Sequence, residues 1–114
     1  MVTRINPGTR YSAAVVHNGV VYLSGVVARD TSGDVRAQAA DVLAQIDETL
    51  AAAGTSKSNL LAATIWLVDI GEWDAMNTVW DQWIDPSNKP ARATVEAKLA
   101  GSDYRIEIQV TAAL

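Results

Sequence analysis

The chain of 114 residues contains no cysteine and a single histidine, His17. Without cysteine there are no disulfides, no thiolate catalysis and no zinc sites with Cys ligands. One histidine also excludes a His-rich metal cluster. Sites for magnesium or calcium made only of Asp and Glu stay open, although no EF-hand spacing is present.

Positive charge is scarce as well: 9 Lys and Arg against 13 Asp and Glu give a formal charge of −4. No basic run is present, so nucleic acid is not an expected partner. The N-terminus lacks the features of a signal peptide, and no apolar run is long enough to span a membrane. Since 49% of the residues are hydrophobic, we expect one folded domain over residues 1–114, soluble and cytoplasmic, with no membrane partner.

The hydrophobic periodicity predicts an alternation of strands and helices. Strands are expected at Tyr11–His17 and Val20–Val27, joined by Asn18-Gly19, a strong hairpin signal because both turn residues adopt positive φ. The other predicted elements are helices over 35–53 and 73–83, strands over 60–68, 92–99 and 104–112, and a short strand near 3–6. Asp34 is the expected N-cap of the first helix, and Gly54 its C-cap.

The order β-β-α-β-α-β-β predicts an α+β fold with a mixed sheet. Two helices cannot cover both faces of so wide a sheet, so we expect them on one face. The last two strands are predicted to pair as a hairpin across Gly101-Ser102. Their apolar side, expected to face the helices, is Val95, Ala97, Leu99, Ile106, Ile108 and Val110. Their polar side, on the uncovered face, is Thr94, Glu96, Lys98, Arg105, Glu107 and Gln109. That face is either solvated or, as the mixed character of the strand over 20–27 suggests, a subunit interface with pockets.

Arg92 and Glu107 are the candidate functional charges of this hairpin. The Arg92 guanidinium can bind a carboxylate through two hydrogen bonds, and Glu107 can act as a general base or hold a water. A surface arginine and a solvated glutamate are the alternative interpretation. In the predicted register Glu107 lies opposite Glu96, and Arg92 is on the order of 13 Å away at about 3.3 Å per residue. We therefore hypothesise that the two residues meet in a pocket shared between subunits.

Three residues of the first strands are further candidates. Tyr11 and Ser24 can donate hydrogen bonds to a polar ligand, and Gly25 allows a close approach of the backbone. Ordinary strand residues with local hydrogen bonds are the alternative. His17 is interpreted as a solvated turn residue, and the tryptophan stripe over 73–83 as core or interface, because no basic residues interleave with it.

Five segments of the chain form a characteristic set. They are Tyr11-Ser12-Ala13-Ala14-Val15, Tyr22-Leu23-Ser24-Gly25, Leu50 through Gly54, Pro90-Ala91-Arg92-Ala93-Thr94-Val95 and Ile106-Glu107-Ile108. Together they resemble the Rid family of reactive intermediate deaminases, also called YjgF-like or L-PSP endoribonuclease-like proteins. The resemblance covers essentially the whole chain, and the Pro-Ala-Arg element is its most specific part. Segments 73–83 and 91–99 look closer to a YoaB-like branch.

The resemblance implies a chorismate mutase-like fold, assembled as a homotrimer whose sheets form a barrel with pockets between subunits. It implies a hydrolase, an enamine/imine deaminase that converts 2-enamine and 2-imine intermediates to 2-oxo acids and ammonia without a cofactor or metal. Its substrate would be a small-molecule carboxylate. Arg92 matches the residue that binds the carboxylate, and Glu107 the one that positions or activates water. Tyr11, Ser24, Gly25 and Thr94 match pocket positions.

The chain departs from the commonest family pattern at three places. Thr9-Arg10 stands where Gly-Pro is usual, Val26-Val27 where Gln-Ile is frequent, and the last turn lacks Leu-Pro. Arg10 adds a positive charge beside the pocket tyrosine, which bears on the anion preferred. A non-catalytic or regulatory trimer that binds small carboxylates is the alternative function. An endoribonuclease is the weakest one, because the chain is acidic and its site has no histidine.

Overall fold

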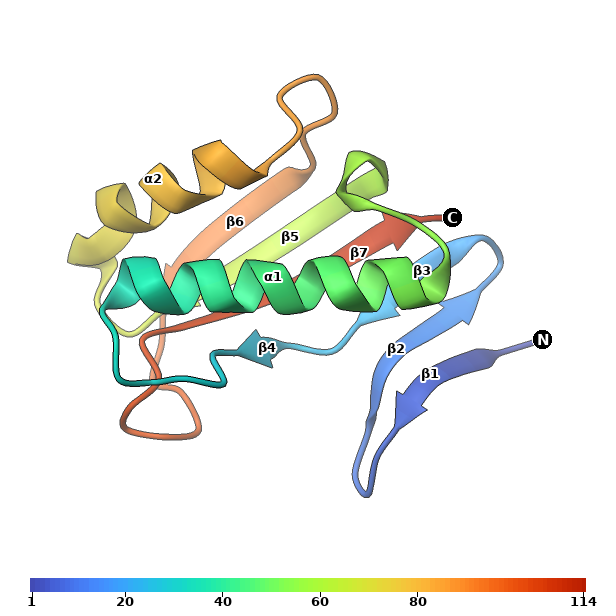
Figure 1. Cartoon of the computed structure of the whole chain (residues 1–114), viewed down its shortest axis with the longest axis horizontal. Helices are drawn as coiled ribbons and strands as arrows, with labels where there is room; N and C mark the ends of the chain where they lie inside the picture. The colour runs from blue at the N-terminus through green and yellow to red at the C-terminus, as the bar shows by residue number, and fades with distance from the viewer.

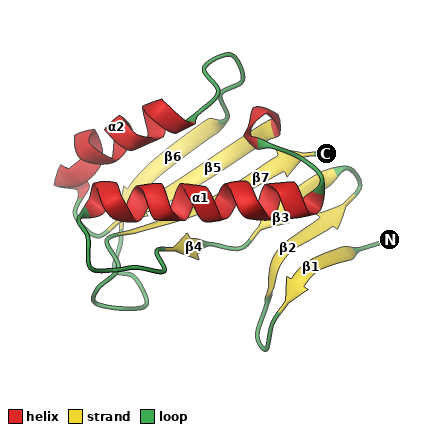
Figure 2. Ribbon diagram, viewed as in Figure 1, coloured by secondary structure: helices red, strands yellow, loops and turns green.

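The computed structural model describes all 114 residues and contains one mixed sheet (Figure 1). The strands are β1 (Thr3–Pro7), β2 (Ser12–His17), β3 (Val20–Leu23), β4 (Val26–Val27), β5 (Leu60–Leu67), β6 (Ala91–Glu96) and β7 (Ile106–Ala113). Their order in the sheet is β1-β2-β3-β7-β5-β6, with β4 beside β7. The helices are α1 (Val35–Ala53) and α2 (Trp73–Trp83), with short 3-10 turns η1 (Lys57–Asn59) and η2 (Ile70–Glu72). Both helices lie on one face of the sheet, which confirms the predicted α+β fold (Figure 2).

The local signals of the sequence act as predicted. The Asp34 side chain accepts a hydrogen bond from the backbone N–H of Ala37 at 3.0 Å and caps α1. Gly54 ends that helix in the left-handed region, with φ of 89°. Asn18 and Gly19 have φ of 50° and 77° in the turn between β2 and β3, as a type I′ hairpin requires.

The core lies between the two helices and the central strands. Alternate residues of β5 and β7 are buried against the helices, namely Ala63, Ile65, Leu67, Ile106, Ile108, Val110 and Ala112. Burying a Leu or Ile side chain contributes about 1.5–3 kcal/mol, so these positions fix which way β7 faces. The alternate residue Glu107 consequently lies on the uncovered face. No helix of this fold is both long and apolar enough to cross a membrane.

The predicted hairpin of the last two strands is wrong. β6 runs parallel to β5 on one side, and β7 runs antiparallel to β5 on the other. The connection over residues 97–105 passes the end of β5, where Ala97 donates a backbone hydrogen bond to Leu67 and Val68 donates one to Arg105. Because β5 is apolar on both faces, a central position buries it better than an edge would.

The inserted strand also changes the face that Arg92 occupies. Arg92 pairs with Ala63 and Thr94 with Ile65, and both β5 residues face the helices. Arg92, Thr94 and Glu96 therefore share a face, as predicted, but it is the helix-covered one. Val95, predicted to face the helices, is 44% exposed on the other side. The predicted opposition of Glu107 and Glu96 is also wrong.

Candidate functional site

The six predicted site residues fall into two groups on one chain. Tyr11, Ser24 and Gly25 line a cavity of about 620 Å³, and Glu107 lies against Gly25. Arg92 lines a separate hollow beside α2, and Thr94 follows it on the same face of β6. Neither hollow contains both Arg92 and Glu107.

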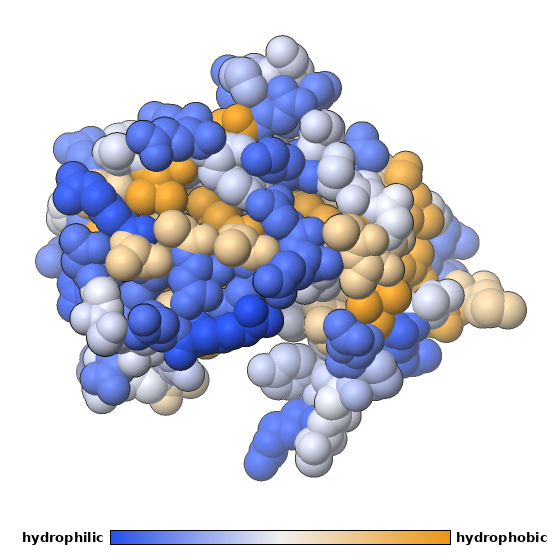
Figure 3. All heavy atoms as spheres, viewed as in Figure 1, coloured by the Kyte–Doolittle hydropathy of each residue, from blue (hydrophilic) through white to orange (hydrophobic).

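The cavity lies between α1 and the projecting β1–β2 hairpin. Its lining comprises Asn6, Gly8, Thr9, Arg10, Tyr11, Ala13, Ser24, Gly25, Val26, Val27, Arg29, Gln45, Glu48 and Thr49. The space-filling view shows a notch between the hairpin tip and the body of the molecule (Figure 3). Tyr11 stands at the rim, 69% exposed, in a turn closed by the hydrogen bond from Gly8 N to Tyr11 O at 2.8 Å. The cavity is thus open to a ligand.

The predicted strand over 20–27 is interrupted at Ser24 and Gly25, which separate β3 from β4. The side-chain amide of Gln109 donates to the carbonyl of Leu23 at 3.2 Å and replaces a ladder hydrogen bond there. A Cβ built on Gly25 would overlap the Glu107 carboxylate. Only glycine leaves room for that side chain in this position.

Glu107 is half-buried, and its carboxylate has no hydrogen-bond or ion-pair partner in the chain. The residue lies between Trp66 of β5 and Val27 of β4. Buried polar groups normally have partners. The free carboxylate can therefore accept a hydrogen bond from a water or a ligand.

Arg92 is a half-buried cation that also has no anionic partner in the chain. Its guanidinium carbon lies 5.1 Å from the ring centroid of Trp80, which is buried. Burial lowers the pKa of Arg92, while the negative charge of Asp81 partly opposes this change. The ring covers one face of the guanidinium and stabilises its charge. The guanidinium N–H groups remain free to bind an anion.

Thr94 carries the only buried side-chain oxygen or nitrogen in the structure that lacks a hydrogen bond. An unsatisfied buried hydroxyl costs about 1–3 kcal/mol. It lies two residues from Arg92 on the same face of β6. The strand thus presents a cation and a hydroxyl, both without partners.

The two groups of site residues are separated by β5. Two strand spacings of about 4.8 Å and three residues of about 3.3 Å place Arg92 on the order of 14 Å from Glu107. They also lie on opposite faces of the sheet. However, β6 is an edge strand with one side free of backbone partners. A second chain can approach Arg92 and Thr94 along this edge.

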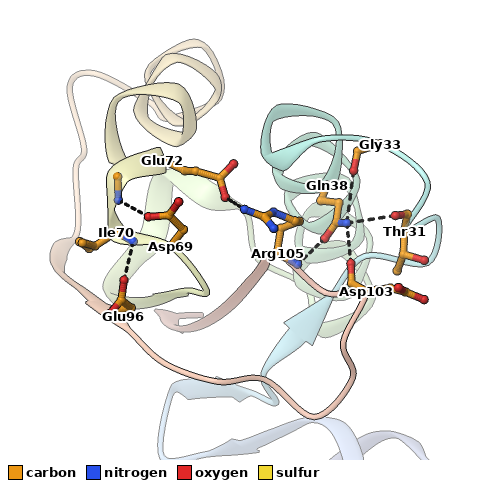
Figure 4. A network of polar contacts seen from close by, with 10 residues as sticks. Thr31, Gly33, Gln38, Asp69, Ile70, Glu72, Glu96, Asp103 and Arg105 are labelled. Carbon is orange, nitrogen blue, oxygen red and sulfur yellow. Dashed lines mark hydrogen bonds and ion pairs between the residues drawn. The ribbon is translucent and has the colours of Figure 1, made fainter.

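A buried amide holds the start of β7, and with it Glu107. Gln38 accepts from the backbone N–H of Arg105 at 2.8 Å and donates to the carbonyl of Asp103 at 3.0 Å. It also bonds the carbonyls of Thr31 and Gly33 (Figure 4). The Arg105 guanidinium pairs with Glu72 at the start of α2. The network joins both helices to the segment that leads into β7.

Several site residues were missed by the sequence interpretation. Trp80 was interpreted as core or interface, yet it also supports Arg92. Gln45 and Glu48 of α1 line the cavity, and Gln45 donates to the carbonyl of Val27 at 2.9 Å. Their three-residue spacing places them on one side of α1. The sequence alone does not show that this side faces the cavity. No group of three or more His, Asp or Glu residues is arranged to hold a metal ion.

Comparisons with known proteins match the whole chain. The family model described as Endoribonuclease L-PSP matches residues 1–114. The RutC family protein YoaB of Escherichia coli (strain K12) is 40% identical over 113 residues, 99% of this chain and 98% of that protein. A 2-iminobutanoate/2-iminopropanoate deaminase of Homo sapiens is 33% identical over 108 residues, 90% of this chain and 78% of that protein. The crystal structure of a YjgF family member from Neisseria meningitidis, 44% identical, superposes with a TM-score of 0.97 over 99% of this chain and 94% of that one.

Proposed function

Since the chain belongs to the Endoribonuclease L-PSP family, we propose that it hydrolyses 2-enamine and 2-imine intermediates to 2-oxo acids and ammonia. Within the family it lies near the YoaB-like members, as its motifs predicted. The relative named 2-iminobutanoate/2-iminopropanoate deaminase supports this reaction class. The observation that carries the proposal is the half-buried guanidinium of Arg92, which has no anion to bind within its own chain.

Arg92 binds the substrate carboxylate through the edge of its guanidinium. Bidentate arginine–carboxylate pairs are shorter and stronger than neutral hydrogen bonds, and their geometry fixes the orientation of the substrate. The free hydroxyl of Thr94 supplies a further hydrogen bond on the same face of β6. Binding therefore satisfies two groups that the isolated chain leaves without partners.

Glu107 acts on the water. Its carboxylate takes one proton from the water as the water oxygen bonds to the imine carbon. The electrons of the C=N π bond move to the nitrogen, and Glu107 passes the proton to that nitrogen. Glu107 then takes the hydroxyl proton of the carbinolamine and passes it to nitrogen as the C–N bond breaks. The products are ammonia and the 2-oxo acid; an enamine first tautomerises to the imine. An imine is already electrophilic, so positioning and general base catalysis suffice.

The complete pocket is formed by two copies of the chain in a homotrimer. Arg92 and Thr94 of one copy face the cavity of the next, which Tyr11, Ser24 and Gly25 line and where Glu107 lies against Gly25. The free edge of β6 supports this arrangement, as do Tyr22 and Val95, which are 47% and 44% exposed. A head-to-tail contact of this kind closes into a ring and repeats the pocket at every interface.

The activity test generates an imine from an amino acid and follows semicarbazone formation in competition with hydrolysis. The wild type is expected to accelerate hydrolysis. Arg92→Ala removes this acceleration and Glu107→Gln reduces it about a hundredfold. Arg36→Ala, which removes an exposed arginine of α1 outside both hollows, is the matched control and keeps wild-type rates. Ordinary rates in both site variants would disprove the assigned roles.

A mixing experiment tests the shared pocket. Arg92→Ala and Glu107→Gln chains are unfolded together at equal concentration and refolded. If each pocket takes Arg92 from one copy and Glu107 from another, random assembly restores about a quarter of the pockets. No recovery of activity would place both residues in the same chain's pocket and contradict the proposal.

A carboxylate-binding trimer without catalysis is the second candidate. It is favoured by one observation: no hydrogen bond within the chain orients Glu107. Calorimetry with a 2-oxo acid distinguishes it from the enzyme. Binding that depends on Arg92, together with no acceleration of hydrolysis, would support the binding function.

A further inference from the structure

Arg10 is a cation without a partner in the wall of the cavity. It is exposed, and it makes no ion pair or side-chain hydrogen bond with the chain. Its backbone is nevertheless well placed, because Gly8 and Tyr11 close the turn around it and Pro7 pairs with Ser12. The turn thus holds the backbone of Arg10 one residue before the pocket tyrosine.

The other charged residues of the cavity neutralise each other. Arg29 and Glu48 form an ion pair with 3.3 Å between Nη2 and Oε2. The lining contains no further Asp, Glu, Lys or Arg besides Arg10. Arg10 is therefore the one unpaired charge of the lining, and it balances the Glu107 carboxylate, which lies against Gly25. An unpaired cation beside Tyr11 favours an anionic group at that end of the cavity.

The cavity is also larger than the simplest imino acids require. Its volume of about 620 Å³ falls within the range of pockets that hold ligands of drug size. A second copy of the chain would fill part of this space. What remains can accommodate a substrate side chain in addition to the reacting imine and its carboxylate.

We infer that Arg10 binds a second anionic group, so the preferred substrates are 2-imino acids with an acidic side chain. This inference rests on the proposed function, in which Arg92 of the neighbouring copy holds the first carboxylate. The side-chain carboxylate then lies at the rim beside Tyr11, where Arg10 meets it. Two cations at opposite ends of the pocket select a dicarboxylic substrate over a monocarboxylic one.

The test compares imines made by oxidation of glutamate and of norvaline, which differ in the charged end of the side chain. Wild-type protein is expected to favour the dicarboxylic imine in kcat/KM by about tenfold, the effect of one charge-assisted hydrogen bond. Arg10→Gln removes this preference, and Arg10→Lys keeps most of it because the charge remains. Arg36→Gln, an equal loss of charge elsewhere on the surface, leaves the preference unchanged.

A binding measurement separates this inference from the proposed activity. Calorimetry with 2-oxoglutarate and 2-oxopentanoate needs no catalysis. Tighter binding of the dicarboxylate, lost in Arg10→Gln, supports the second anion site even if no imine is hydrolysed. Hydrolysis of both imines at equal rates would overturn it and leave the deaminase function standing. Equal binding of both 2-oxo acids by the wild type would also overturn it.

Discussion

Gly25→Ala is the sharpest single test of the site, because it moves the Glu107 carboxylate without touching its chemistry. A Cβ on Gly25 would overlap a carboxylate oxygen of Glu107 and lie 3.1 Å from its Cδ and 3.4 Å from its Cγ. Carbon atoms are at their optimal separation at about 3.5–4.0 Å. The carboxylate must therefore shift by about 1 Å, a displacement that can cost about a hundredfold in rate.

The same substitution should leave stability nearly unchanged. Gly25 is not among the glycines with positive φ, so alanine introduces no backbone strain. The group displaced is the flexible end of a side chain, and alanine reduces the entropy of the unfolded chain by about 0.4–1 kcal/mol. We expect a free energy of unfolding within about 1 kcal/mol of the wild type, measured by urea denaturation.

Imine hydrolysis and a double-mutant cycle complete the test. Gly71→Ala is the matched control, because its Cβ would also meet a carboxylate oxygen, Asp69 Oδ1 at 3.0 Å, but at η2 away from the cavity. In a Glu107→Gln background, Gly25→Ala should lower the rate of imine hydrolysis only slightly further, since both changes act on the side chain at position 107. Full activity of Gly25→Ala, or additive losses in the double variant, would refute the role of this contact.

Three further predictions concern the surroundings of the site. Trp80→Leu should weaken binding of a 2-oxo acid by about 3- to 10-fold in calorimetry, while Trp80→Phe keeps most of the affinity because it retains an aromatic face under Arg92. Gln38→Leu leaves the part-buried N–H of Arg105 without an acceptor. It should lower the free energy of unfolding by about 1–3 kcal/mol in urea titrations, and an unchanged value would contradict this role of Gln38. The pKa of Asp41 is lowered mainly by the hydrogen bond from the backbone N–H of Asp30, and the Gln45 side chain contributes. The ionised Asp41 therefore stabilises the folded state above the unfolded pKa of about 3.9. This stabilisation is lost as the pH falls through the lower pKa that Asp41 has in the folded state. At pH 7 the free energy of unfolding of Asp41→Ala should therefore be about 1 kcal/mol below that of the wild type. When both proteins are acidified below about pH 3.9, the variant should lose less stability than the wild type. Parallel acid-unfolding curves would contradict this.

Much of the fold could be predicted because its signals are local. The capping side chain of Asp34, the left-handed Gly54 and the Asn18-Gly19 turn each act within a few residues, so the sequence shows them directly. The bounds of the first helix were predicted with the help of its caps, and those of the second from the helical spacing of an apolar stripe, Trp73, Met76, Trp80 and Trp83. The interruption at Ser24 and Gly25 was not, because it depends on Gln109 and Glu107, which lie far along the chain.

The alternation of residues along a strand shows which side chains share a face, whereas the pairing of the strands sets whether that face is covered by the helices. Side chains alternate between the two faces of a strand in the same way whether it pairs with the strand next to it in the sequence or with a more distant one. The connection over 97–105 places β5 between β6 and β7, and this places Arg92 on the helix side and Glu107 on the other. Strand pairing of this kind is set by the burial of β5, a property of the whole sheet. The motif residues were therefore visible in the sequence, whereas the placement of Arg92 and Glu107 on opposite faces of the sheet follows from the fold.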